Sequence, residues 1–384
     1  MISTARKSER ALLVCAKVFR RREALPMSAS LAELADLART AGAKVVGSFT
    51  QQLSKPTHHY LGKGKLEQLK ETVLSKRIDT VICDDELTPT QQRNLERALE
   101  EKVKVIDRTA LILDVFAARA QTREGRLQVE LAQHEYLMPR LAGQWSHLER
   151  LGGGIGTRGP GESQIETDRR LVRNRIQHIK RELSRVSRQR DLYRSRRRNE
   201  GIPVVSLVGY TNAGKSTLLN SLTAAGVTAE DKLFSTLDPV TRKVRLASGR
   251  EVLFTDTVGF IQKLPPAIVA AFRATLEEIR EARIIVHVAD VSSSNLENHI
   301  GEVESILKGL EIVNKPTILA LNKTDLLPIG DDPRDGDDVP IAGDPPSGVV
   351  LISAAECRGL DKLLEEVERL LSAVDPVETT LAAL

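Results

Sequence analysis

The stretch Gly209-Tyr-Thr-Asn-Ala-Gly-Lys-Ser-Thr217 matches the pattern G-x-x-x-x-G-K-[ST]. The apolar run 204–208 before it indicates a short buried strand, and 216–222 after it indicates the start of a helix. Loops of this pattern cradle phosphates with their backbone N–H groups, and the helix N-terminus adds the positive end of its dipole. Their lysine, here Lys215, reaches the β- and γ-phosphate oxygens, and their hydroxyl, here Ser216, reaches Mg²⁺. We therefore expect an α/β domain that binds a nucleotide at this loop.

Three motifs further along the chain, each after a strand-like run, indicate which nucleotide is bound. Asp256-Thr-Val-Gly259 is placed to bring its carboxylate to the Mg²⁺ side of the phosphates. The aspartate of Asn322-Lys-Thr-Asp325 can accept hydrogen bonds from N1–H and the exocyclic amine of guanine. Adenine lacks both donors and would leave that carboxylate unpaired, which costs several kcal/mol. Ser353-Ala-Ala355 looks like the last base-contacting loop of GTPases. The four motifs together predict GTP binding.

Composition sets the outer limits of the architecture. A chain of 384 residues is expected to form two or three domains. Its three cysteines, Cys15, Cys83 and Cys357, have no metal-binding spacing and favour a reducing compartment. No apolar run reaches 18 residues, so no membrane span is expected. The basic start 1–22 is compatible with a transit peptide, but the β-branched run 11–18 favours a strand, and we expect a cytoplasmic protein.

Alternating strand-like and helix-like segments predict an α/β fold in three parts followed by a tail. The expected parts are an N-terminal α/β domain at 1–120, a helical hairpin at 121–200 with a glycine-rich loop at 152–162, a GTP-binding domain at 201–373 and a tail at 374–384. Within the first part, Tyr60-Leu-Gly-Lys-Gly-Lys65 is either a phosphate-binding turn or a plain strand-to-helix connection, and the sequence leaves both open.

The second helix of the expected hairpin is strongly basic. Between Asp168 and Glu200 there are thirteen Arg or Lys against four Asp or Glu, so i,i+4 pairing cannot neutralise the helix. One alternative is that the basic side chains simply face solvent. Clustered Arg residues gain binding free energy when they neutralise phosphates, however, and this favours a polyanion partner. We expect the loop 152–162 to insert into folded RNA, although a flexible connector is also compatible with its six glycines. The candidate RNA-binding residues are Arg158, Arg169, Arg170 and Arg173.

These motifs resemble the HflX family of translational GTPases, within the Obg-like group. The resemblance covers nearly the whole chain and is most specific at the glycine-rich loop 152–162, Glu166-Thr-Asp-Arg-Arg170, Phe234-Ser-Thr-Leu-Asp-Pro239, Thr241-Arg242 and Asp256-Thr-Val-Gly-Phe260. It implies GTP hydrolysis and binding to the large ribosomal subunit, with ribosome splitting under stress in some members. Some members also bind or hydrolyse ATP through the N-terminal region. Longer relatives carry an additional C-terminal domain, most of which we expect this chain to lack.

By the same resemblance, catalysis involves Lys215, Thr236 and Gly259, and the Mg²⁺ ligands are Ser216, Thr236 and, through water, Asp256. Thr236 is placed ahead of Thr241 as the switch threonine. The full set of predicted GTP-binding residues is Gly209, Tyr210, Thr211, Asn212, Ala213, Gly214, Lys215, Ser216, Thr217, Phe234, Ser235, Thr236, Leu237, Asp238, Asp256, Thr257, Val258, Gly259, Asn322, Lys323, Thr324, Asp325, Ser353, Ala354 and Ala355.

Two positions bear on the rate of hydrolysis. Phe260 stands where Ras-like enzymes have a glutamine that orients water, and an apolar ring cannot do this. Slow turnover stimulated by the ribosome is therefore expected. In related GTPases an asparagine at the position of Asn212 helps to hold K⁺; bracing of the loop is the alternative role.

The leading hypothesis is a ribosome-dependent GTPase, and we expect it to be a monomer. The alternatives are a GTP-controlled switch acting on a protein partner and an ATP-dependent RNA remodeller. Salt dependence of binding separates the first two, and ATP turnover that survives Lys215→Ala would indicate the third.

Overall fold

The computed structural model describes most of the chain. The described residues are 8–18, 26–100, 103–141, 160–199, 201–223, 233–265, 268, 273–312, 315–327 and 348–374. Contacts within the chain divide it into two compact units: Met1–Val186 with Lys263–Ala271, and Ser187–Gln262 with Phe272–Leu384. The predicted boundaries near 120 and 200 do not coincide with this division and remain predictions.

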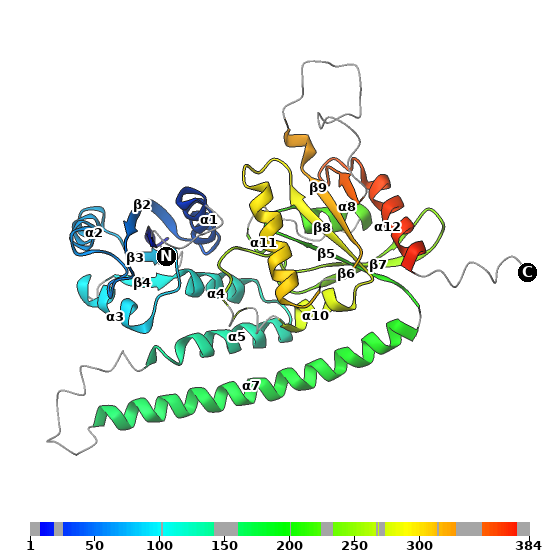
Figure 1. The fold of residues 1–384 in the computed structure, drawn as a ribbon. Coiled ribbons are helices and arrows are strands. Elements are labelled where there is room, and N and C mark those ends of the chain that lie inside the picture. Colours follow the sequence, from blue (N-terminus) through cyan, green and yellow to red (C-terminus); the bar gives the residue numbers. More distant parts are fainter. Residues whose placement is uncertain are drawn as a thin grey trace, which may run out of the picture. The chain divides into compact units, whose positions relative to one another are not determined.

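The first unit contains a four-stranded parallel sheet in the order β2-β1-β3-β4 (Figure 1). Its strands are β1 (Arg10–Val18), β2 (Lys44–Leu53), β3 (Thr80–Cys83) and β4 (Lys104–Asp107). Its helices are α1 (Met27–Thr40), α2 (Lys63–Lys76), α3 (Pro89–Ala98) and α4 (Arg108–Arg119). Apolar side chains of α2 and α3 pack with β1 and β3 into one core, while α1 contacts α4. The predicted α/β character of this region is confirmed.

A helical hairpin follows, made by α5 (Arg123–Leu137) and the long α7 (Pro160–Asn199). An apolar seam joins the two helices, with Leu127 and Leu131 packed against Ile176 and Ile179. Ion pairs run along the seam in antiparallel order, from Arg123–Glu182 to Arg175–Glu130. The predicted helical hairpin is therefore confirmed, whereas most of the glycine-rich loop, including Arg158, lies outside the described residues.

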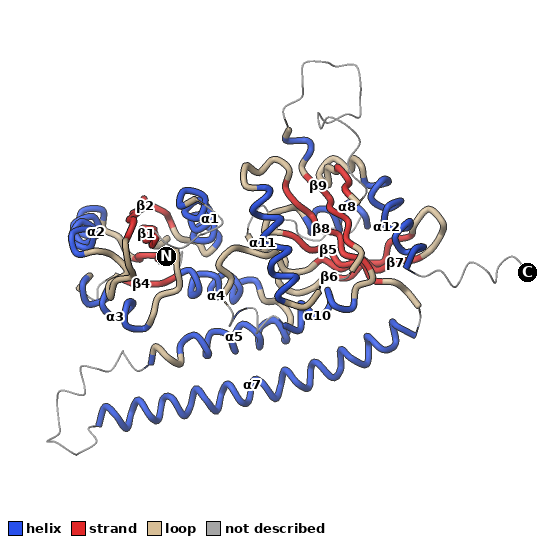
Figure 2. The backbone as a smooth tube through the Cα atoms, viewed as in Figure 1, coloured by secondary structure: helices blue, strands red, loops and turns tan. Residues whose placement is uncertain are grey.

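The second unit contains a six-stranded sheet in the order β10-β9-β8-β5-β7-β6, parallel except for β6. Its strands are β5 (Val204–Gly209), β6 (Val240–Arg245), β7 (Glu251–Asp256), β8 (Ile284–Asp290), β9 (Thr317–Asn322) and β10 (Val349–Leu351). Its helices are α8 (Lys215–Thr223), α10 (Arg273–Glu281), α11 (Leu296–Gly309) and α12 (Leu360–Val374). Figures 1 and 2 show α8 and α12 on one face of this sheet and α10 and α11 on the other.

The apolar core of the second unit explains why these segments fold as they do. The central strands are buried on both faces, as near-continuous Val/Ile/Leu runs require, and they pack with Leu218 of α8 and with Leu363 and Val367 of α12. Strand β6 ends at Arg245. Leu246 lies at the start of the hairpin turn, where its backbone N–H donates to the carbonyl of Arg250. This sheet brings the ends of β5, β7 and β9 to one edge, where polar residues collect.

Candidate nucleotide-binding site

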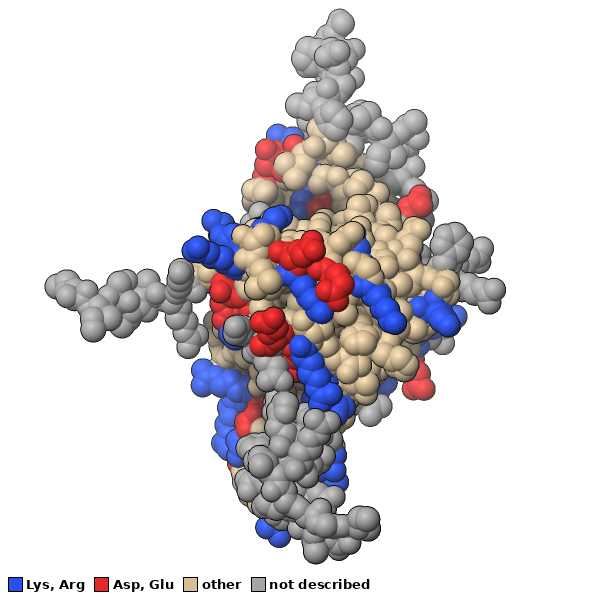
Figure 3. All heavy atoms as spheres, turned by 90° about the vertical axis from the view of Figure 1, so that its left-hand side faces the viewer, with Lys and Arg blue, Asp and Glu red and all other residues tan. Residues whose placement is uncertain are grey.

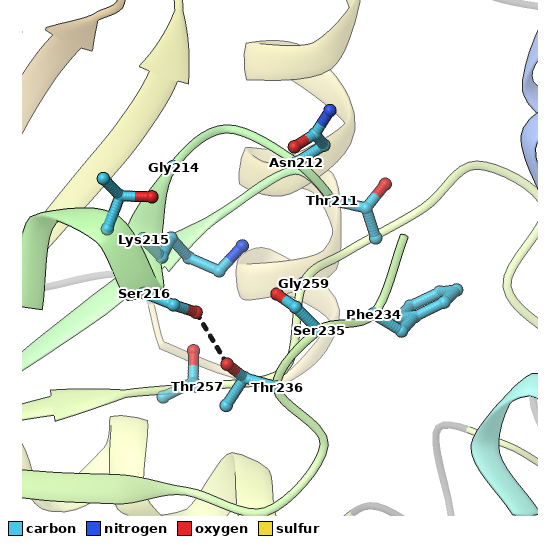
Figure 4. Close-up of a pocket in the computed structure, with 11 residues that line it drawn as sticks. Thr211, Asn212, Gly214, Lys215, Ser216, Phe234, Ser235, Thr236, Thr257 and Gly259 are labelled. Carbon is cyan, nitrogen blue, oxygen red and sulfur yellow. Dashed lines mark hydrogen bonds between the residues drawn. The ribbon is translucent and has the colours of Figure 1, made fainter. Parts of the chain in front are cut away.

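The loop between β5 and α8 has the backbone that the glycines of its motif allow. Gly214 has φ +93°, and a Cβ there would lie 2.2 Å from the Nδ2 atom of Asn322. A side chain at this position would be both strained and in collision, so only glycine is compatible with the turn. A pocket at the loop is lined by Thr211, Asn212, Gly214, Lys215, Ser216, Thr217, Phe234, Ser235, Thr236, Thr257 and Gly259 (Figure 4).

Lys215 lies buried in this pocket and donates hydrogen bonds to the backbone carbonyls of Gly209 (3.2 Å) and Tyr210 (2.9 Å). Burial lowers the pKa of Lys215 to about 8, although the nearby Asp256 opposes this shift. A desolvated ammonium gains more from an anion than a solvated one does, because the local dielectric is low. The electrostatics of the pocket therefore favour a polyphosphate.

Three oxygen-bearing side chains from separate elements meet beside Lys215. The hydroxyl of Ser216 lies 2.6 Å from that of Thr236, and both hydroxyls donate to Oδ2 of Asp256, at 2.6 and 2.8 Å. The other carboxylate oxygen, Oδ1, is buried and has no hydrogen-bond partner within the described chain. Burial raises the pKa of Asp256 despite the opposing effects of Lys215 and the two hydroxyls. A buried carboxylate beside two hydroxyls fits a hard cation such as Mg²⁺.

The structure distinguishes the two candidate switch threonines. Figure 4 shows Thr236 directed toward Ser216, with Phe234 directed away from the group. Thr241 lies in β6 instead, where its hydroxyl is 2.9 Å from that of Thr255 in the neighbouring strand. The geometry favours Thr236 as the ligand of a metal at this position.

The segment after Asp256 runs directly beside the phosphate loop. A Cβ on Gly259 would lie 2.9 Å from Cα of Thr211 and 3.1 Å from Nζ of Lys215, so this position has no room for a side chain. Phe260 pairs with the loop through its backbone: its N–H donates to Gly209 and its carbonyl accepts from Thr211. The Phe260 ring is 1% exposed and is not among the residues that line the pocket, so it does not take the place of a water-orienting glutamine.

The motif predicted to contact guanine is braced by Asn322. Its Nδ2 donates to the carbonyl of Ala213 (2.9 Å), and its Oδ1 accepts from the N–H of Ala354 (2.9 Å). This side chain therefore ties the phosphate loop to the loop after β10. The Ser353 hydroxyl donates to Oδ1 of Asp325 at 2.6 Å, which leaves the other carboxylate oxygen for a further donor.

Six further residues predicted to bind GTP differ in burial and in their contacts. Lys323 adopts a left-handed backbone (φ 67°) and binds Asp290 at 2.7 Å, while Thr324 bonds to the carbonyl of Ile352. Leu237 and Val258 are buried core positions, Asp238 is half-buried and Ala355 is exposed. None of these six residues lines the pocket described above, so their assignment to the nucleotide remains a prediction.

The candidate RNA-binding residues that the structure describes lie on α7. Arg170 and Arg173 are exposed and Arg169 is half-buried. Neighbouring cations on the same helix bind acids of α5, with Arg175 at Glu130 (2.6 Å) and Lys180 at Glu135 (2.8 Å). On the face of the molecule drawn in Figure 3, basic and acidic side chains are interspersed. Polyanion binding by α7 remains a prediction.

The contacts of the 60–65 turn favour a plain strand-to-helix connection over a phosphate-binding turn. Gly62 is the N-cap of α2, and its N–H, which a phosphate would need, donates to Oε1 of Gln51 at 2.9 Å. The ammonium of Lys65 lies over the ring of Phe49, 4.6 Å from its centroid. Both groups are engaged inside the unit, and the glycines serve the start of the helix.

Sequence reasoning missed His287, which is buried in β8 between Val208 of β5 and Leu319 of β9. Burial, together with the Lys215 ammonium, lowers the pKa of His287 to about 4. The local sequence of β8 does not distinguish this histidine from the other core residues of the strand. Only the order of the strands in the sheet reveals that it lies near Lys215.

We expect His287 to make the protein sensitive to acid. Its pKa is lower in the folded than in the unfolded state, so the unfolded chain binds more protons between pH 6.5 and 4 and stability falls as the pH decreases through this window. At about pH 4.5 the loss from this residue is about 2–3 kcal/mol. Urea unfolding at neutral and acidic pH should show a smaller pH-dependent loss for His287→Gln than for the wild type; equal losses would contradict the assignment.

None of the described helices is long and apolar enough to cross a lipid bilayer. This finding concerns only the residues that the structure describes.

Comparison with protein families gives three matches along the chain. Residues 28–117 match the family described as GTP-binding GTPase N-terminal, 119–197 match GTP-binding GTPase Middle Region, and 204–323 match 50S ribosome-binding GTPase. The matches cover both the N-terminal sheet and the region that contains the phosphate loop.

Individual relatives are similar over most of their length. GTPase HflX of Caldanaerobacter subterraneus is 51% identical over 372 residues, 96% of this chain and 82% of the relative. GTPase HflX of Escherichia coli is 48% identical over 298 residues, 77% of this chain and 70% of the relative. Among solved structures, the complex of SsGBP with GDP is 25% identical with a TM-score of 0.49, covering 95% of this chain and 99% of that one.

Proposed function

Since the chain belongs to the HflX family of GTPases, we propose that it binds GTP at the pocket beside Lys215 and hydrolyses it in association with the large ribosomal subunit. The observation that carries this proposal is the convergence of Ser216, Thr236 and Asp256 next to a desolvated lysine. Those three residues would hold Mg²⁺, which when bound neutralises charge on the β- and γ-phosphate oxygens.

The chain's own residues account for the positioning of the nucleotide. The backbone of the phosphate loop and the Lys215 ammonium bind the phosphates. The Gly259 amide, which has no side chain in the way, would donate a hydrogen bond to an oxygen of the γ-phosphate, and Thr236 would keep its place beside Ser216 and Asp256 only while that phosphate is present. Asp325, oriented by Ser353, recognises guanine. Hydrolysis releases Thr236 and Gly259, and this change would end the interaction with the partner.

Asn212 is a candidate for a second role in this site. Its backbone is left-handed (φ 61°) and its exposed side chain lines the pocket. A carboxamide oxygen beside the phosphates fits a K⁺ ligand, so we propose K⁺ as an additional cofactor. Faster GTP turnover in K⁺ than in Na⁺ buffer, lost in Asn212→Ala, would support this role over simple bracing of the loop.

The large ribosomal subunit is the proposed activating partner. Two features support it: the match of residues 204–323 to a family described as 50S ribosome-binding GTPase, and the basic excess of α7. Phe260 supplies no hydrogen bond to orient water, so unaided turnover is expected to be slow. We propose the cytoplasm as the site of action and splitting or rescue of stalled ribosomes as the outcome.

The test is GTP hydrolysis by the purified chain with and without isolated large subunits, at two salt concentrations. Strong stimulation is expected, and it should weaken as salt rises, because each phosphate contact releases counterions. The double variant Arg170→Ala and Arg173→Ala should bind subunits more weakly and with a shallower salt dependence, each lost contact reducing the slope by about 1.

A matched control is Lys180→Ala, whose ammonium already binds Glu135. It should lower the affinity for subunits less than the double variant does. Intact GTP binding with no stimulation by subunits would move the conclusion to a switch that acts on a protein partner.

A further inference from the structure

Lys263, four residues after Gly259, is the first residue beyond the Asp256-Thr-Val-Gly259 motif that belongs to the first unit. Gln262 closes a stretch of the second unit, whereas Lys263 and the residues after it belong by their contacts to the first. The Lys263 ammonium lies 2.7 Å from Oδ2 of Asp84 and 2.7 Å from Oδ1 of Asp85. Both acids directly follow β3, at the carboxyl edge of the N-terminal sheet.

The two acceptors are held in place by other partners of the first unit. Asp84 is fully buried and accepts from the Ser30 hydroxyl (2.7 Å), with Nη1 of Arg108 3.6 Å from its second oxygen. Asp85 accepts from the Tyr60 hydroxyl at 2.6 Å. The acids have partners in the first unit other than Lys263, so little ordering cost falls on the ion pair itself.

The charges of the cluster are mutually stabilising. Burial alone would lower the pKa of Lys263, but the Asp84 and Asp85 carboxylates outweigh it and raise this pKa. Burial alone would raise the pKa of Asp84, but the positive charges of Arg108 and Lys263 outweigh the effect of burial and lower the pKa of Asp84. Lys263 also adopts a left-handed backbone (φ 54°), a conformation that costs about 1 kcal/mol or more in a residue with a side chain and persists only where its surroundings impose it.

The other end of the same segment is held by the phosphate loop. The carbonyl of Phe260 accepts from the N–H of Thr211 (2.7 Å), and the N–H of Gln262 donates to the Tyr210 hydroxyl (3.0 Å). The Tyr210 ring in turn stacks on His299 of α11, with centroids 4.0 Å apart. Gly259, which must meet the γ-phosphate, therefore lies four residues from the lysine anchored at Asp84 and Asp85.

We propose that Lys263 is a positioning residue of this GTPase: its binding to Asp84 and Asp85 holds the 259–262 segment in the arrangement that presents the Gly259 amide to a γ-phosphate. This inference rests on the function proposed above. GDP has no γ-phosphate and does not use the Gly259 amide, so the anchor favours GTP over GDP. By thermodynamic reciprocity, GTP also stabilises the anchor in the first unit.

Lys263→Met tests the proposal, because it keeps the apolar stem and removes the charge. We expect the affinity for a non-hydrolysable GTP analogue with Mg²⁺ to fall about tenfold, the range of a typical coupling free energy, and the affinity for GDP to change less than about twofold. Amide exchange at β3 and Asp85 should be slowed by the analogue in the wild type and not in the variant. A purely structural lysine would produce neither the change in the affinity ratio nor the loss of this nucleotide-dependent protection.

Two further variants complete the test. Asp85→Asn, which leaves the buried Asp84 intact, should lower the analogue-to-GDP affinity ratio in the same direction, and its effect should not add to that of Lys263→Met. Lys243→Met removes a surface pair with Glu251 and should leave the ratio unchanged. An unchanged ratio in Lys263→Met, or equal loss of both nucleotides, would overturn the role of Lys263. Failure of the wild-type chain to bind the analogue would instead overturn the nucleotide site itself, and this role with it.

Discussion

Lys215→Ala is expected to lower GTP turnover by about a hundredfold or more, the range seen when a preorganised charge-stabilising donor is removed from an active site. The ammonium is buried beside the oxygens of Ser216, Thr236 and Asp256, and no other cation lines the pocket within the described chain. Its loss would leave the phosphate charge to the loop amides and the metal alone. Hydrolysis under single-turnover conditions and the affinity for a labelled GTP analogue measure the effect.

The variant should remain folded. A desolvated ammonium whose pKa is lowered to about 8 is itself unfavourable in the folded state, so alanine removes a cost along with the interaction. Lys362→Ala, at an exposed position of α12, is the matched control and should turn over GTP as the wild type does. Ser216→Asn, which replaces the hydroxyl at the metal position, should also impair the reaction. Undiminished turnover in both Lys215→Ala and Ser216→Asn would refute the assignment of the site.

Asp325→Asn is expected to weaken GTP binding by about a hundredfold and to improve binding of xanthosine triphosphate. Two donor bonds from guanine would be lost and an amide N–H would face the donors of the base, a penalty of about 2–3 kcal/mol. Ser353 fixes the direction of this change. Its hydroxyl donates to Oδ1 of Asp325, so the carbonyl oxygen of the new asparagine keeps that bond and its NH₂ group turns toward the base.

Xanthine carries a carbonyl where guanine carries its amine, and it can accept from that NH₂ group. Competition of both triphosphates against a labelled analogue measures the change in preference. Asp361→Asn, on the exposed first turn of α12, supplies a matched substitution that should leave the preference for guanine intact. If Asp325→Asn lost affinity for both triphosphates equally, Asp325 would be bracing the loop rather than reading the base.

The sequence alone was sufficient to predict those features whose residues must lie close together along the chain. The phosphate loop could be recognised because Gly214, Lys215 and Ser216 must be adjacent for one turn to present amides, an ammonium and a hydroxyl together. The α/β character of both sheets followed from alternating strand-like and helix-like segments. In the predicted hairpin, Ile176 and Ile179 are three residues apart and therefore lie on one side of α7.

Only the tertiary structure decided the contacts between distant segments, because these contacts depend on the order of the strands in the sheets and not on the spacing of residues along the sequence. The order β8-β5-β7 brings Asp256 to Ser216 and distinguishes Thr236 from Thr241. It also places His287 near Lys215, which no pattern in an apolar strand could indicate. The ion pair of Lys263 with Asp84 joins residues 179 positions apart. Each of these side chains is ordinary in its local sequence, and each acquires its role from the neighbours that the folded sheets provide.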